Sequence, residues 1–250
     1  KHMYKKLIYT FLFISALSTN VLSEIINIGV PYIHNYPKKE YKAGTQNWSI
    51  SQDQQGFMYF ANNDGLLIFD GVTWQLYRMP NSSIVRSVYI TPNGQIFIGA
   101  YNELGKMEIA QTGKKEFVSL KKHIPEEFHN FDDIWNITEI EGKIVFQSYN
   151  STFIYKNDST VSVLKAPSRF QNSFQVNDRL YFNDINKGLL EFSSNKLNVL
   201  DGCKSIRGEE IWSIVPFRKG NDLMICTLNK GIFIYNGKEL KAWSTTIILP

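Results

Sequence analysis

A pattern of four short strands repeats along the chain, and this repeat restricts the fold more than any other feature. Its first copy, residues 47–78, has three apolar or alternating runs separated by turns rich in Asn, Asp and Gly. A fourth run ends just before Pro80, and proline cannot donate a hydrogen bond to a sheet ladder. The pattern predicts one four-stranded antiparallel sheet.

Four further copies follow at similar spacing. The residues that open the predicted third strands lie 40, 47, 36 and 43 residues apart and are Gly65, Gly105, Thr152, Gly188 and Gly231. This spacing is typical of four-stranded blades. A single blade cannot cover its own two apolar faces, whereas blades that pack side by side cover both. We therefore expect an all-β fold, a β-propeller of four-stranded antiparallel blades. A long β-sandwich is the alternative, but it does not explain the repeated turn before each third strand.

The repeat divides the chain into three parts. We expect a signal peptide at residues 1–23, an irregular segment at 24–46 that could include a strand at 25–30, and the propeller at 47–250. The approximate blades are 47–81, 82–127, 132–168, 170–202 and 209–246. Propellers have about four to eight blades, so five units allow either a closed five-bladed ring or part of a larger one.

The leader favours export. A basic start with Lys5 and Lys6 precedes an apolar run from Leu7 to Leu17, and small residues at Val21 and Ser23 suit cleavage after Ser23. A membrane anchor is the alternative, but the run is shorter than the ~20 residues that a spanning helix needs. We therefore expect an exported, periplasmic protein.

Composition excludes disorder and a nucleic-acid partner. The chain of 250 residues is 43% apolar, which is enough for an ordinary core. The formal net charge of +4 comes largely from the leader, and without residues 1–23 the chain has 24 basic and 23 acidic residues. Cys203 lies in a predicted turn and Cys226 in a predicted strand, so we expect free thiols.

No catalytic, metal or cofactor motif is evident. The sequence has no nucleophile elbow, phosphate loop or dinucleotide fingerprint. The four histidines, His2, His34, His123 and His129, lack metal-ligand spacing. Adjacent residues of a strand point to opposite faces, so we interpret three acidic pairs as solvated charges. These pairs are Glu126 with Glu127, Asp132 with Asp133, and Glu209 with Glu210.

Candidate ligand-binding residues lie in the loops between second and third strands, which share one edge with the loops that link blades. Their amide, carboxylate and aromatic groups suit sugar hydroxyls, although turns favour Asn and Asp in any case. The candidates are Asn63, Asp64, Asn102, Glu103, Tyr149 and Asn150.

Two further candidates lie on innermost strands. Arg86 interrupts an apolar run, so its charge must be paired or face the central channel. Trp135 opens its unit at the position that Trp48 and Trp212 occupy in theirs. For these tryptophans we favour inter-blade packing over ligand stacking.

Several adjacent phrases carry a family resemblance. GTQNWSISQDQQGFMYFANNDGLLIFDGVTWQLY, SIVRSVYITPNGQIFIGAYNELGKME and DIWNITEIEGKIVFQS resemble the periplasmic sensor region of bacterial hybrid two-component and triple-tyrosine-domain regulators. The resemblance covers about residues 25–246 and implies two-component-regulator propeller repeats in seven-bladed rings, usually two in tandem. A triple-tyrosine domain, a membrane span and a histidine kinase or helix-turn-helix output would follow, and the full-length form could be a homodimer.

Relative to that pattern, this sequence would be the N-terminal fragment of such a regulator, because it ends after five units. The resemblance implies a non-catalytic sensor that detects a glycan fragment or a partner domain. A secreted enzyme is the alternative, since related repeats occur in streptogramin lyases and five-bladed propellers include glycosidases.

Overall fold

The computed structural model describes residues 29, 33–156, 160–218 and 220–244. The chain divides into two units, residues 1–36 and 37–250, and the following description concerns the second. The predicted signal peptide, and the possible strand at 25–30 apart from Gly29, lie outside the described residues. A short helix, α2 (Lys38–Tyr41), which the sequence did not indicate, precedes the first blade. Within the described ranges, no helix is long and apolar enough to cross a membrane.

In the described part of the chain, twenty strands form five four-stranded antiparallel sheets, which confirms the predicted propeller fold. Blade 1 comprises β1 (Asn47–Gln52), β2 (Met58–Asn62), β3 (Gly65–Phe69) and β4 (Trp74–Tyr77). Blade 2 comprises β5 (Val85–Ile90), β6 (Ile96–Ala100), β7 (Glu103–Ile109) and β8 (Lys115–Ser119). Blade 3 comprises β9 (Asn136–Ile140), β10 (Lys143–Gln147), β11 (Ser151–Tyr155) and β12 (Val161–Lys165). Blade 4 comprises β13 (Phe170–Val176), β14 (Arg179–Asp184), β15 (Gly188–Ser193) and β16 (Lys196–Val199). Blade 5 comprises β17 (Ile211–Pro216), β18 (Leu223–Thr227), β19 (Ile232–Tyr235) and β20 (Leu240–Ala242).

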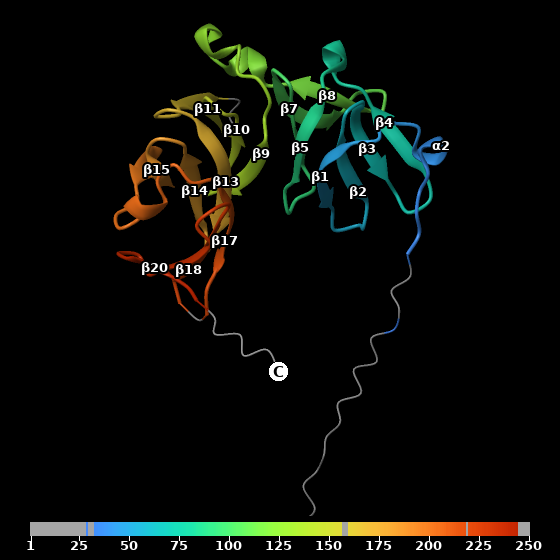
Figure 1. Cartoon of the computed structure of the whole chain (residues 1–250). Coiled ribbons are helices and arrows are strands. Elements are labelled where there is room, and N and C mark those ends of the chain that lie inside the picture. Colours follow the sequence, from blue (N-terminus) through green and yellow to red (C-terminus); the bar gives the residue numbers. More distant parts are fainter. Residues whose placement is uncertain (1–28, 30–32, 157–159, 219, 245–250) are drawn as a thin grey trace, which may run out of the picture. The chain divides into compact units, whose positions relative to one another are not determined.

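Within each blade the strands follow chain order, and neighbouring blades meet through their first strands. β1 contacts β5, β5 contacts β9, β9 contacts β13 and β13 contacts β17 (Figure 1). The starts of these five strands therefore lie on the same edge of successive blades.

Both faces of a central blade are buried, because alternate residues of one strand enter different cores. In β10, Ile144 and Phe146 enter the core shared with blade 2, whereas Val145 enters the core shared with blade 4. This arrangement explains why the second and third strands read as continuous apolar runs rather than as alternating ones.

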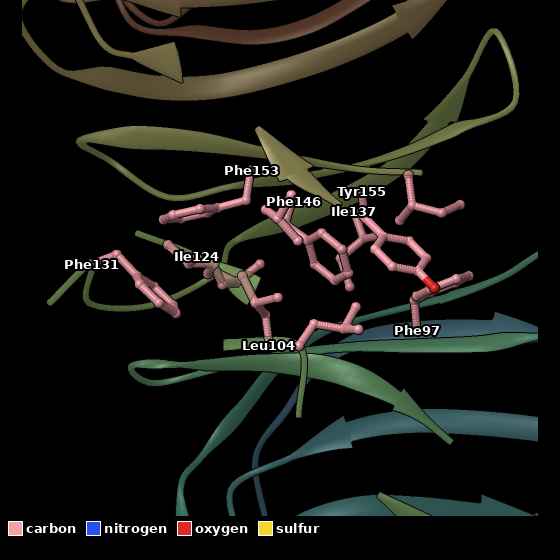
Figure 2. Close-up of a cluster of buried hydrophobic side chains, with 12 residues drawn as sticks. Phe97, Leu104, Ile124, Phe131, Ile137, Phe146, Phe153 and Tyr155 are labelled. Carbon is pink, nitrogen blue, oxygen red and sulfur yellow. The ribbon is translucent and has the colours of Figure 1, made fainter. Parts of the chain in front are cut away.

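The core between blades 2 and 3 shows how such a layer packs (Figure 2). The ring centroid of Phe97 lies 6.0 Å from that of Phe146 and 5.8 Å from that of Tyr155. All three side chains are buried. Burial of an aromatic side chain stabilises the fold by roughly 1.5–3 kcal/mol, so the blades are held together mainly by these layers.

One predicted strand start is wrong. The sequence predicts that Gly105 opens the third strand of blade 2, but β7 already begins at Glu103, and Gly105 lies inside the strand. A Cβ atom at Gly105 would collide with the carbonyl oxygen of Val118 and the ring of Phe117. This glycine therefore allows a close approach of β8 rather than a reversal of the chain.

We expect Phe146→Ala to lower the free energy of unfolding by about 3–5 kcal/mol, because it leaves a cavity between two blades. Urea denaturation followed by circular dichroism measures this change. Val72→Ala is the control, since Val72 is 85% exposed. Similar losses in the two variants would contradict the assignment of the inter-blade core.

Candidate ligand-binding site

A β-bulge lies at the start of four of the five first strands. The pairing register shifts near the starts of β1, β5, β13 and β17, and the extra residues are Trp48, Arg86, Gln171 with Asn172, and Trp212. In blade 3, Trp135 donates its backbone N–H to Gln147 (2.8 Å), the residue that also pairs with Asn136. Bulges turn side chains out of the regular alternation and are frequent beside functional sites. We call Trp48, Arg86, Trp135, Asn172 and Trp212 the bulge residues.

Arg86 lies against two tryptophan rings that also contact each other, with ring centroids 5.8 Å apart. Its guanidinium carbon is 4.0 Å from the ring centroid of Trp48 and 5.0 Å from that of Trp135. Its Nε donates to Oδ1 of Asp133 at 2.8 Å, and both side chains are mostly buried. The expectation that this charge is paired is therefore confirmed.

The stack continues across blade 3 into blade 4. The rings of Trp135 and Tyr149 are tilted with centroids 5.4 Å apart, and the guanidinium carbon of Arg169 lies 4.1 Å from the Tyr149 centroid. We call Trp48, Arg86, Trp135, Tyr149 and Arg169 the aromatic–arginine stack. Its members come from blades 1, 2 and 3 and from the connection just before blade 4, and each cation lies against the negative face of a ring.

The stack brings together four of the predicted site residues. Arg86, Trp135 and Tyr149 belong to it, and Asn63 accepts a hydrogen bond from the indole Nε1 of Trp48 at 2.8 Å. Asp133 and Arg169 were missed, because no local pattern marks them. The only signal for Asp133 was the unpaired charge of Arg86, which required a carboxylate somewhere in the fold.

Two interpretations of acidic pairs are corrected by these contacts. Asp133 pairs with Arg86 rather than with solvent. Glu209 is only 12% exposed at its side chain and lies 3.5 Å from the ammonium of Lys230. Both residues lie in connections between blades, where the alternation of a strand does not apply, so adjacent residues need not share an environment.

The packing interpretation of the tryptophans is wrong for Trp212, which is 62% exposed. Trp212 and Trp135 instead line a cavity of about 260 Å³, which we call the Trp135–Trp212 cavity. The other lining residues are mainly polar: Asn136, Gln147, Asn172, Ser173, Phe174 and Glu210. The cavity thus combines two indole rings with three side-chain amides and one carboxylate.

Asn102 and Glu103 line a different cavity of about 340 Å³ with Tyr101 and Lys121. Both side chains are already engaged, because the amide oxygen of Asn102 accepts from the Phe131 N–H at 3.4 Å and Glu103 accepts from the Leu104 N–H and the Ser119 hydroxyl. These bonds indicate a structural role for the two predicted residues.

The remaining two predicted residues lie apart from the stack contacts. The backbone N–H of Asp64 donates to the side chain of Asn62, which is fully buried. Asn150 is exposed, and its carbonyl oxygen accepts from the N–H of Ala166. The preference of turns for Asn and Asp accounts for both positions.

Asp184 is a fully buried carboxylate that holds a loop. Burial alone would raise its pKa, but hydrogen bonds from the Ser168 hydroxyl and from the N–H groups of Ser168, Lys187 and Asn186 outweigh burial and lower the pKa. The carboxylate therefore stabilises this loop as an anion and is not accessible to a substrate.

The histidines do not form a metal centre in the described ranges, where no group of three His, Cys, Asp or Glu side chains could hold an ion. His129 contacts the carbonyl oxygen of Ile124 through Nε2 at 2.8 Å. Cys203 and Cys226 are free thiols in the structure.

We expect Asp133→Asn to lower the free energy of unfolding by about 1.5–3 kcal/mol, because it leaves the buried charge of Arg86 without a counterion. Urea denaturation of the purified chain measures the loss. Asp132→Asn is the matched control, since Asp132 is exposed and its φ of 60° is one that asparagine tolerates. Equal stability of the two variants would show that the ion pair contributes nothing.

Asp184 should make the free energy of unfolding depend on pH in the acidic range. Its pKa is lower in the folded chain than the value of about 3.9 expected for the unfolded chain, so its contribution is full above that pH and is lost as the pH falls through the folded pKa. We expect Asp184→Asn to be destabilised most at neutral pH, with the difference from the unmodified chain shrinking in acid. A difference that grows in acid would contradict this.

Comparisons with known proteins identify the fold. No protein-family model and no curated protein matches the chain significantly. Virginiamycin B lyase from Staphylococcus aureus is 14% identical with a TM-score of 0.62, and the match covers 82% of this chain and 71% of the lyase. The extracellular domain of a proposed hybrid two-component system from B. thetaiotaomicron is 18% identical with a TM-score of 0.58, covering 80% of this chain and 27% of that one. At these identities the comparisons establish the β-propeller fold alone.

Proposed function

We propose that the chain is a non-catalytic recognition propeller, the exported sensor part of a two-component-type regulator, and that it binds a glycan fragment at the bulge residues. The Trp135–Trp212 cavity is the observation that carries this proposal. An indole ring offers an apolar face for a sugar ring. The amide nitrogens of Asn136 and Asn172 already donate to Ser173 and Ile211, which orients their side-chain oxygens as acceptors for hydroxyl groups. The chemistry of the cavity suits a neutral, hydroxyl-rich ligand.

The exposure of Trp212 strengthens the proposal. A large aromatic side chain that is 62% exposed leaves much apolar area in water beside the cavity. Trp212 is also the extra residue of a β-bulge, and the pairing of β17 with β18 is regular again from Ser213 onward. A ligand that stacks on the ring would remove this area from water.

The sensing role is supported by one structural likeness. The B. thetaiotaomicron structure is described as the extracellular domain of a proposed hybrid two-component system. A sensor role for this chain agrees with the predicted signal peptide and with the predicted periplasmic location. A second propeller, a triple-tyrosine domain, a membrane span and a signalling output would be the partners of such a sensor, and a homodimer its full-length form.

The enzyme alternative is favoured by the likeness to virginiamycin B lyase. Glycoside hydrolysis normally needs two carboxyl groups about 5–9 Å apart across a cleft. Glu103 and Asp184 are engaged in structural hydrogen bonds, with Ser119 and Ser168 respectively. Glu210 is the one carboxylate among the residues that line the Trp135–Trp212 cavity, so recognition fits the geometry better than hydrolysis.

We expect Trp212→Ala to weaken glycan binding at least tenfold, because it removes one wall of the cavity, with stacking alone contributing about 0.5–1.5 kcal/mol. Isothermal titration against a panel of plant and host oligosaccharides measures this. Trp243→Ala is the matched control, since Trp243 is 37% exposed, packs near Phe217 and lies outside the cavity.

The same panel distinguishes the alternative. New reducing ends, or an unsaturated product, that disappear in Glu210→Gln would show catalysis and overturn the sensor proposal. Equal losses in the two tryptophan variants would place the ligand elsewhere.

A further inference from the structure

Another cavity lies at the opposite edge of blades 1 and 2. It has a volume of about 830 Å³ and is lined by the β1–β2 turn, the β5–β6 turn, the end of β7 and the start of β8. β1 runs from the bulge at Trp48 to the turn at Asp53, so the two edges are separated by about 15 Å of strand. This cavity is therefore distinct from the proposed glycan site. Its volume falls in the range of roughly 300–1,000 Å³ that is usual for small-molecule sites.

One wall of this cavity is apolar. It includes Phe57, Ile96, Met107 and Ile109. Ile109 is 74% exposed although it lies at the end of a strand, and Phe57 is half-buried. An apolar group bound here would remove their area from water, at roughly 25 cal/mol for each Å².

The charged residues that line the cavity differ in whether they already have a partner. Nζ of Lys115 lies 5.8 Å from the ring centroid of Tyr59, and the described residues offer it no carboxylate within ion-pair distance. The two carboxylates that line the cavity are engaged elsewhere. Asp53 accepts from the Tyr59 hydroxyl and from two backbone N–H groups, and Glu108 pairs with Lys106 at 2.7 Å. Lys115 is thus a charged lining group that has no ion-pair partner among the described residues, and the carboxylate of Asp53, although it keeps its negative charge, has its oxygens occupied by three donors.

Two hydrogen bonds hold the walls in place. Nε2 of Gln54 donates to the carbonyl oxygen of Pro92 at 2.9 Å and joins the turns of the two blades. Nε2 of Gln95 donates to the carbonyl oxygen of Met107 at 2.7 Å and joins β6 to β7. A cavity whose walls are already joined loses little conformational entropy when a ligand binds.

We propose that this cavity is a second small-molecule site, and that it binds an organic carboxylate with an apolar body. The carboxylate pairs with the ammonium of Lys115, and the apolar body lies against Phe57, Met107 and Ile109. The ligand class follows from this combination of one unpaired cation with an apolar wall, and it differs from the neutral, hydroxyl-rich ligand of the opposite edge.

Phenylacetate, its neutral counterpart phenylacetamide and inorganic phosphate are the probes for this site. We expect phenylacetate to bind with a dissociation constant of about 1–10 mM, and the amide and phosphate to bind at least threefold more weakly. Ligand-observed NMR titration of the whole chain gives the three constants. Equal affinity for phenylacetate and phenylacetamide, or no binding of phenylacetate, would overturn the proposal.

Three variants locate the binding. Lys115→Gln should weaken phenylacetate binding about three- to tenfold with an unchanged melting temperature, because it removes only the ion pair. Lys114→Gln is the matched control, since Lys114 is exposed and does not line the cavity. Trp212→Ala should leave phenylacetate binding intact even if the glycan proposal fails. A loss of phenylacetate binding in Lys114→Gln or in Trp212→Ala would contradict the site. Unchanged phenylacetate binding in Lys115→Gln would contradict it too.

Discussion

The burial of each blade's apolar faces against its neighbouring blades is the constraint on which the rest of the structure depends. Alternate residues of β10 enter two different cores, so blade 3 is stable only between blades 2 and 4. Neither proposed site lies within these inter-blade cores. The bulge residues lie at one edge and the Lys115 cavity at the other, which explains why a fold with such apolar strands can carry two sites of different character.

The buried charge of Arg86 connects this packing to the candidate site. A guanidinium removed from water needs a counterion, and Asp133 supplies it while the rings of Trp48 and Trp135 pack against the guanidinium. Contacts from blades 1, 2 and 3 thereby converge on one side chain and fix the position of Trp135. Trp212 lies on the other side of the Trp135–Trp212 cavity and is mostly exposed. One wall of the cavity is thus held rigidly, and the other remains available for a ligand.

The sequence predicted the blades well because strand alternation and turn residues are local signals. It also predicted that Arg86 needs a partner, but not which one, since Asp133 lies 47 residues away and is brought near only by the packing of two blades. Gly105 was predicted to open a strand, whereas it lies inside β7 and allows a close approach of β8. The turn candidates Asn102 and Glu103 show the same limit, because composition does not reveal which polar groups the backbone already uses.

The central claim is that bulge residues form the ligand-binding edge, and the indole N–H signals of the chain test it most directly. The five tryptophans are Trp48, Trp74, Trp135, Trp212 and Trp243. With ¹⁵N-labelled protein and an oligosaccharide that binds, the account predicts shifts of the Trp135 and Trp212 indole signals, while those of Trp74 and Trp243 stay in place. Shifts confined to Trp74 or Trp243 would contradict it.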